Sequence, residues 1–371
     1  MTKAPSPRAA TFFAPRRVAL AAFIPPILAA ALLAQGARAA PKLDPAPLVV
    51  EWLMPRYDTL AAAAADQKKA WAQFCGRTEP ASLDTLKSAF IVTANAWNAV
   101  EFVTFGPAAR SLRADRFSFF PDRRNAVARG LADLVADPSP DRLEPQRFAA
   151  LSAAVQGLPA LERLLFDEKA AAALAAGPES KRRCAIGQAV AGNLATIASE
   201  IRSVWGDRTQ GLVADLAAKK GDPDYFPDPD ALPGMILTDL AGAYQRVDDQ
   251  KIAPVMGDSA DEAKPLAADG WRAGRSGQVV VNMIESADAL LREAALQTPD
   301  PARRSLALAA DAADAAAKRF PLDLGAAAKT AEGRADVAAA VKAFKAAQTA
   351  VVNTLAPSLD VTLGFNALDG D

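Results

Sequence analysis

The sequence of 371 residues contains no histidine. Histidine is the usual ligand of catalytic zinc and the usual base beside a serine or cysteine nucleophile, so its absence excludes those kinds of site. A histidine proton switch near neutral pH is excluded for the same reason. Carboxylate, tyrosine or carbonyl oxygens remain as metal ligands, and they suit iron or another hard cation and not zinc.

Cysteine and aromatic residues are scarce as well. The chain has two cysteines, and aromatic residues make up 6% of it. No stretch shows the alternation of β-branched and polar residues that is typical of strands, whereas alanine-rich amphipathic stretches are frequent, so an all-α fold is expected. Cys75 and Cys184 both lie near the ends of expected helices. In an oxidising compartment this favours one disulfide over two buried free thiols.

The first 39 residues have the pattern of a signal peptide. Two arginines precede an apolar run over residues 18–34, and Ala-Arg-Ala, ending at Ala39, is a small-x-small cleavage site. Two prolines within the run and its modest length disfavour a membrane anchor. We therefore expect cleavage after Ala39 and a periplasmic protein with no transmembrane segment in the mature chain.

The charge balance excludes another class of partner. Residues 1–39 include five basic residues and no acidic one, so their removal changes the formal net charge from −1 to −6. A mildly acidic protein lacks the basic footprint of a nucleic-acid binder.

The pattern of helix formers and breakers predicts two helical bundles in series. Residues 40–219 form the first expected bundle and residues 220–371 the second, which begins at a segment rich in proline and aspartate. The expected helices cover 48–74, 82–103, 124–135, 145–176, 179–205, 231–247, 276–297, 301–317 and 332–355.

Two carboxylates fall within apolar helical stripes. At 3.6 residues per turn, Glu162 points into the leucine-rich face of 151–165, and Glu101 continues the apolar stripe of 86–97. An ionised carboxylate in an apolar setting is costly unless it is paired or hydrogen-bonded, so each should meet an arginine, an amide, water or a cation. The alternative is that each helix turns slightly and its glutamate is solvated at the rim.

Two further segments carry candidate ligand-binding residues. Arg272, Arg275 and Ser276 lie at an expected helix start, where cations and amide donors could hold an anion, although an ordinary helix cap is the simpler interpretation. The last eight residues include a phenylalanine and Asp369, and we expect this tail to dock on the protein.

Five motifs, taken together and in this order, resemble the imelysin-like family, also known as peptidase family M75 or iron-regulated protein A. They are W-N-A-V-E-F-V-T-F-G-P at 97–107, F-F-P-D-R-R at 119–124, G-L-P-A-L-E-R-L-L-F at 157–166, W-R-A-G-R-S at 271–276 and G-F-N-A-L-D-G-D at 364–371. The resemblance spans nearly the whole mature chain. It implies two four-helix-bundle-like domains, a site between them, and an association with iron uptake.

The family motif, Gly-x-His-x-x-Glu, is only partly kept. Gly157 matches the glycine and Glu162 the glutamate, whereas Pro159 stands in the place of the histidine. Proline has no ligand atom in its side chain and no backbone N–H, so histidine-dependent metal binding and peptidase activity are not expected here. We also expect Pro159 either to kink a helix or to begin one.

The sequence thus favours a periplasmic binding or accessory protein over an enzyme, with an iron-related ligand or an envelope protein as its partner. Two alternatives stay open. One is an M75-type metallopeptidase, and the other is a structural or interaction module whose carboxylates are salt-bridged.

Overall fold

The structure is a computed structural model, and it describes residues 41–77 and 82–364. The cleavage site expected after Ala39 lies outside these residues. The all-α expectation is confirmed, because 71% of the described residues are helical and none of them lies in a strand. None of the helices in the described ranges has the length and apolar character needed to cross a membrane.

The helices of the first half are α1 Pro45–Pro47, α2 Met54–Gly76, α3 Leu83–Asn98, α4 Arg113–Phe117, α5 Ala126–Ala136, α6 Pro145–Phe148, α7 Leu158–Phe166, α8 Glu168–Ala175, α9 Ser180–Trp205 and α10 Leu212–Ala217. Those of the second half are α11 Leu232–Arg246, α12 Ala253–Met256, α13 Ser276–Ala295, α14 Asp300–Ala317, α15 Leu324–Ala327, α16 Ala331–Ala350 and α17 Ala356–Ser358. Short 3₁₀ turns cover Gly106–Ala109, Asp141–Leu143, Ala153–Val155, Pro229–Ala231 and Pro265–Ala267.

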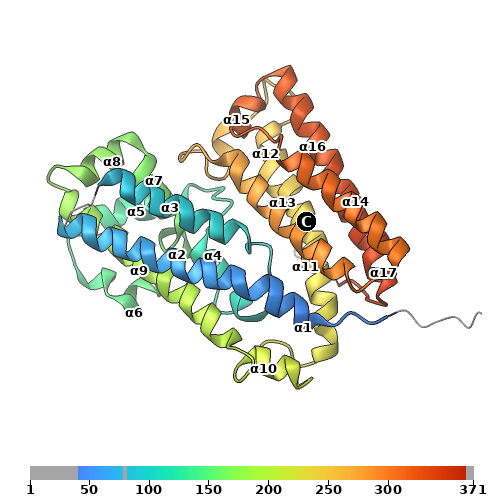
Figure 1. The fold of residues 1–371 in the computed structure, drawn as a ribbon. Helices are drawn as coiled ribbons and strands as arrows, with labels where there is room; N and C mark the ends of the chain where they lie inside the picture. The colour runs from blue at the N-terminus through green and yellow to red at the C-terminus, as the bar shows by residue number, and fades with distance from the viewer. Residues whose placement is uncertain (1–40, 78–81, 365–371) are drawn as a thin grey trace, which may run out of the picture. The chain divides into compact units, whose positions relative to one another are not determined.

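Long helices pack side by side in both halves of the chain (Figure 1). Helix α2 packs along α9 and α3, while α13 and α16 both pack against α14, and α11 contacts α13 and α16. Helix α13 also contacts α3. The boundary at residue 220 between two bundles remains a prediction.

Three π-helical segments occur in the described chain, and each precedes a proline. The segments are Leu48–Leu53, Val247–Ile252 and Val351–Leu355. Pro55, Pro254 and Pro357 each follow two residues after the end of a segment. A proline inside a helix lacks an N–H and crowds the carbonyl one turn earlier, and the wider π turn relieves that crowding. The helix therefore continues past each proline, and at Pro55 this agrees with the single helix expected over 48–74.

The helix expected over 145–176 is wrong in its continuity. The chain forms α6, a 3₁₀ turn, α7 and α8 in its place. Gly157, with φ −128° and ψ −166°, and Asp167, with φ −66° and ψ 117°, have extended backbones that interrupt the helical path. Pro159 lies in the first turn of α7, so it begins a helix and does not kink one.

Helix α3 begins at the expected N-cap, since the Ser82 side chain accepts a hydrogen bond from the Thr85 N–H. It ends at Asn98, short of the expected Val103. Beyond it, apolar side chains at positions 100, 102, 103 and 105 are all buried. One helical face cannot bury that spacing, so the chain leaves the helix, and Glu101 lies in a turn.

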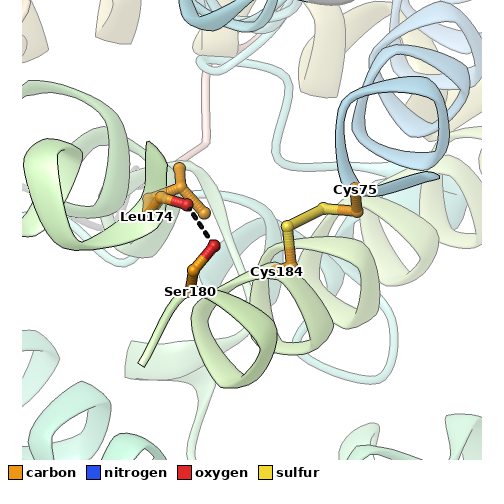
Figure 2. Close-up of a disulfide and its surroundings, with 4 residues drawn as sticks. All are labelled: Cys75, Leu174, Ser180 and Cys184. Atoms are coloured by element: carbon orange, nitrogen blue, oxygen red, sulfur yellow. Dashed lines mark hydrogen bonds between the residues drawn. A yellow bond between two sulfur atoms is a disulfide. The ribbon is translucent and has the colours of Figure 1, made fainter. Parts of the chain in front are cut away.

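A disulfide joins Cys75, in the last turn of α2, to Cys184, near the start of α9 (Figure 2). The two Cα atoms are 5.7 Å apart, a usual separation for this bond. Beside it, the Ser180 hydroxyl donates to the Leu174 carbonyl at 2.7 Å, which ties the end of α8 to the start of α9.

Reduction of this disulfide should lower the free energy of unfolding. The bond closes a loop with a sequence separation of 109 residues, and chain entropy alone gives such a crosslink about 4–5 kcal/mol. Urea unfolding with and without reductant measures the difference. The double variant Cys75→Ser/Cys184→Ser should match the reduced protein and show no response to reductant. A response in that variant would show that the change in stability does not come from this disulfide.

Candidate functional site

Gly157 allows two backbone segments to approach closely at the start of α7. A Cβ atom at this position would lie 2.3 Å from the Phe117 carbonyl oxygen and 2.7 Å from that of Arg116. Both neighbours are backbone atoms, which cannot move aside as a flexible side chain would. Gly157 therefore has a packing role that brings the end of α4 against the start of α7.

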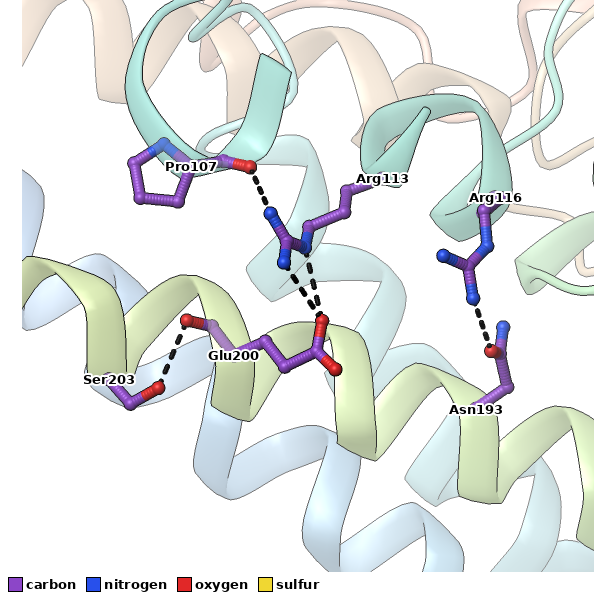
Figure 3. A network of polar contacts seen from close by, with 6 residues as sticks. All are labelled: Pro107, Arg113, Arg116, Asn193, Glu200 and Ser203. Carbon is purple, nitrogen blue, oxygen red and sulfur yellow. Dashed lines mark hydrogen bonds and ion pairs between the residues drawn. The ribbon is translucent and has the colours of Figure 1, made fainter. Parts of the chain in front are cut away.

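Arg116 fixes the residue before this glycine. Its Nε donates to Gln156 Oε1 at 2.8 Å, and Nη2 donates to Asn193 Oδ1 at 3.0 Å, the contact drawn in Figure 3. The Asn193 amide in turn donates to the Gln156 carbonyl oxygen at 3.0 Å. One arginine thus links α4, α9 and the turn that leads into α7, and this holds the α7 N-terminus in place.

Glu162 is buried, as its place in the leucine stripe predicted. Its side chain lies on α7 with the residue only 7% exposed, and Oε1 accepts a hydrogen bond from the Ala273 N–H at 3.2 Å. Burial, followed by the nearby charge of Asp269, raises the pKa of Glu162 to about 7, against the lowering effect of the Ala273 hydrogen bond and Arg272.

Glu101 meets a cation that the sequence did not indicate. Lys251, only 1% exposed, donates to Glu101 Oε1 and to Asp269 Oδ2, both at 2.6 Å, and lies 4.3 Å from the centre of the Phe120 ring. Burial lowers the pKa of Lys251, but the two carboxylates outweigh it and raise the pKa above its ordinary value. Glu101 Oε2 is buried without a hydrogen-bond partner.

A cavity of about 40 Å³ lies beside Glu162. We call it the Glu162 cavity. It is lined by Phe90, Ile91, Ala94, Asn95, Asn98, Ser118, Leu158, Pro159, Glu162, Asp269, Gly270, Ala273, Arg275 and Val279. A space of this size admits a few atoms, and its lining combines apolar side chains with a few convergent polar groups, as ligand sites do.

The residues of the W-R-A-G-R-S motif divide into three roles. Arg275 lines the cavity, and its Nε is buried with no hydrogen-bond partner. Arg272 donates to Asp167 Oδ1 at 2.8 Å, so it braces the segment before α13 against the end of α7. Ser276 is buried and accepts a hydrogen bond from the Leu324 N–H at 3.0 Å, which is a structural contact.

The structure thus brings Glu162, Gly157 and Arg275 to one region and connects Glu101 to it through Lys251 and Asp269. Glu101 does not line the cavity. Asp369 lies outside the described residues.

Sequence reasoning missed Lys251, Asp269 and Asn98. Asp269 could have been found, because it lies just before the W-R-A-G-R-S motif. Lys251 gave no signal of its own: it contacts Glu101 from 150 residues away.

The described carboxylates do not fit a metal centre. No group of three or more histidine, cysteine, aspartate or glutamate residues in the described ranges could hold a metal ion. Two of the site carboxylates, those of Glu101 and Asp269, share the ammonium group of Lys251.

The described chain is an all-helical protein with a buried, partly polar cavity lined from α3, α7 and the segment that precedes α13. A family model, Imelysin (peptidase M75), matches residues 53–351, and the chain belongs to this family. The resemblance seen in the five motifs is thereby confirmed.

Two solved structures share the fold. An imelysin-like protein from Psychrobacter arcticum is 19% identical, with a TM-score of 0.67 over 86% of this chain and 95% of the other. A protein from Parabacteroides distasonis, provisionally described as an iron-regulated protein A precursor, is 15% identical, with a TM-score of 0.66 over 87% of this chain and 97% of the other. A comparison with curated proteins gave no match.

Replacement of Lys251 by methionine should destabilise the protein strongly. It would leave the carboxylates of Glu101 and Asp269 without their cation, and loss of one partner of a buried ion pair costs about 3–5 kcal/mol. A matched control is Lys345→Met, which breaks the ion pair with Asp248 at a lysine side chain that is 61% exposed. That change should cost less than about 1 kcal/mol. Equal losses in urea unfolding would contradict the role given to Lys251.

Glu162 should make the stability fall as the pH rises. Its pKa is about 7 in the folded chain against 4.5 for the free side chain, so the folded state binds more protons between these values and loses stability as they leave. The full difference amounts to about 3 kcal/mol above pH 7.

The variant Glu162→Gln isolates this effect. Burial raises the pKa of Asp239 to about 6 and that of Asp288 to about 7, so these groups add their own slope in both proteins. The free energy of unfolding of the variant minus that of the wild type should therefore rise between pH 4.5 and 8. A difference that stays flat over this range would show that Glu162 titrates normally.

Proposed function

We propose that this imelysin-family protein is exported and serves as a ligand-binding or accessory protein associated with iron uptake, without peptidase activity. The observation that carries the proposal is the Glu162 cavity, in which a buried carboxyl and the unpartnered Nε of Arg275 line one small space. Native proteins seldom leave such groups unsatisfied unless a ligand or water completes them.

The absence of histidine supports the view that the cavity does not cleave peptides. Pro159 stands where the resemblance places the histidine of the family motif, and it also lines the cavity. A zinc peptidase needs about three protein ligands to activate water, usually including histidine. No histidine is available anywhere in the sequence.

The link to iron rests on kinship. One structural neighbour carries the description of an iron-regulated protein A precursor, although its 15% identity supports only the shared fold. Export rests on the signal-peptide pattern of residues 1–39, and the disulfide suits an oxidising compartment.

Titration of the mature chain with iron in several forms tests the proposal. The probes are a ferric salt, a ferric hydroxamate complex, ferric citrate and the two iron-free chelators. The readout is tryptophan fluorescence, since Trp271 lies two residues before Ala273, whose N–H donates to Glu162. We expect at least one iron form to bind and Arg275→Gln to weaken binding about tenfold, the effect of losing a charge-assisted hydrogen bond.

The matched control is Arg208→Gln, which removes an arginine that is 78% exposed at the surface and should leave binding unchanged. The iron link fails if no iron form binds the wild type. Cleavage of unstructured peptides that is lost on chelation and in Glu162→Gln would establish the peptidase alternative. Absence of both activities would leave the structural module.

A further inference from the structure

The Glu162 cavity offers hydrogen-bond donors that no described group uses. The Arg275 side chain has no hydrogen bond or ion pair with the described residues, and its Nε is buried. The side chains of Asn98 and Ser118 also line the cavity without a hydrogen bond to the described chain. A buried N–H group without a partner is unfavourable, so an anion that accepts from Arg275 Nε would be stabilising.

A chain of amides adds another donor. Gln278 Nε2 donates to Asn282 Oδ1 at 2.8 Å, and Asn282 Nδ2 donates to Asn95 Oδ1 at 2.9 Å. Each amide has one acceptor oxygen and one NH₂ group, so a chain that runs in this direction leaves the Asn95 NH₂ as the free end. Asn95 lines the cavity, and the free donor therefore belongs to it.

One oxygen of each carboxyl group that lines the cavity is engaged. Asp269 Oδ2 accepts from Lys251, and Glu162 Oε1 accepts from the Ala273 N–H. Lys251 faces two carboxylates and Arg272 faces Asp167, whereas no described carboxylate pairs with Arg275.

We propose that the Glu162 cavity binds the carboxylate group of a small acid, held by Arg275 and the Asn95 amide, and that Glu162 carries a proton in the complex. This inference rests on the proposed function, since it names the chemical class of the ligand at the same cavity. No covalent step is involved: the acid enters as an anion, and one proton from solvent accompanies it.

The size of the cavity limits what enters. A volume of about 40 Å³ accommodates a carboxylate and little more, so the rest of a larger acid must stay outside. Arg275 and Asp269 are both half-buried, so the cavity is not sealed from solvent. The carboxylate can therefore come from a free monoacid such as acetate or from one arm of a larger chelator such as citrate.

Protonation of Glu162 couples the binding to pH. Burial and Asp269 raise its pKa to about 7, and an anion bound beside it would raise the pKa further. The charged groups that face Glu162 are Asp167, Arg163, Asp269, Arg272 and Arg275. We expect the proton of Glu162 to govern the pH dependence.

Calorimetric titration of the mature chain tests the proposal. Acetate and citrate are added at pH 6, 7 and 8, in buffers with different ionisation enthalpies, which reveals the number of protons taken up. We expect uptake of up to one proton per site at pH 7 and 8. The affinity should fall about tenfold per pH unit above the pKa of Glu162.

Variants test which side chains bind the acid and which one takes up the proton. Arg275→Gln should weaken binding at least tenfold, and Arg275→Lys should restore part of it. Glu162→Gln resembles the protonated acid, so it should keep the affinity and lose both proton uptake and pH dependence. The control is Glu200→Gln. Glu200 lies on α9, pairs with Arg113 (Figure 3) and does not line the cavity. This variant should bind the acids as the wild type does. Unfolding curves check that each variant folds.

Each outcome of these titrations supports or overturns the inference. Binding of acetate alone would identify a monoacid, and binding of citrate alone would identify one arm of a chelator. The inference is overturned if neither acid binds the wild type, or if Arg275→Gln binds them equally well. If both acids fail while a ferric hydroxamate binds, the carboxylate inference is wrong and the proposed function stands. If both acids bind while no iron form does, the link to iron is wrong and the ligand class stands.

Discussion

The site depends on one lysine that is held inside the protein by two carboxylates. Lys251 brings together the turn after α3, which carries Glu101, and the segment before α13, which carries Asp269. Charges attract strongly where water is excluded, and a buried cation without partners is very unfavourable. The ion pairs of Lys251 with Glu101 and Asp269 therefore fix the segment that presents the Ala273 N–H to Glu162. The position of Arg275 follows from the same constraint, since this segment ends where α13 begins.

The sequence was sufficient for the helices because their signals are local. The N-cap at Ser82 and the amphipathic pattern of α9 require only neighbouring residues. Predictions failed where a distant contact overrode the local pattern. Helix α3 stops because four apolar residues beyond it must all be buried, and the 145–176 helix breaks because Gly157 must approach the Phe117 carbonyl. Neither the residues that bury the positions after α3 nor the contact of Gly157 with Phe117 can be deduced from the local sequence.

The burial of Glu162 was predictable because its signal is local, whereas the partner of Glu101 was not. Glu162 lies in a regular helix, so the wheel placed it correctly in the interior. The same wheel, applied to Glu101, extended a helix that ends three residues earlier, although the need for a cation there was inferred from the cost of burial. Lys251 could not be identified as that cation, because its inward direction is set within a π-helical segment whose register departs from the 3.6-residue period.

The lack of histidine does not leave this protein without a group that titrates near neutral pH. Imidazole titrates there without help, whereas a carboxyl must be brought there by its surroundings. Burial and Asp269 do this for Glu162. The Lys251 ammonium group limits the effect, since it offsets part of the negative charge of Asp269. The same lysine thus sets both the position of the cavity wall and the protonation of the carboxyl beside it. Glu162 thus gives this histidine-free chain a carboxyl group with a pKa near neutrality.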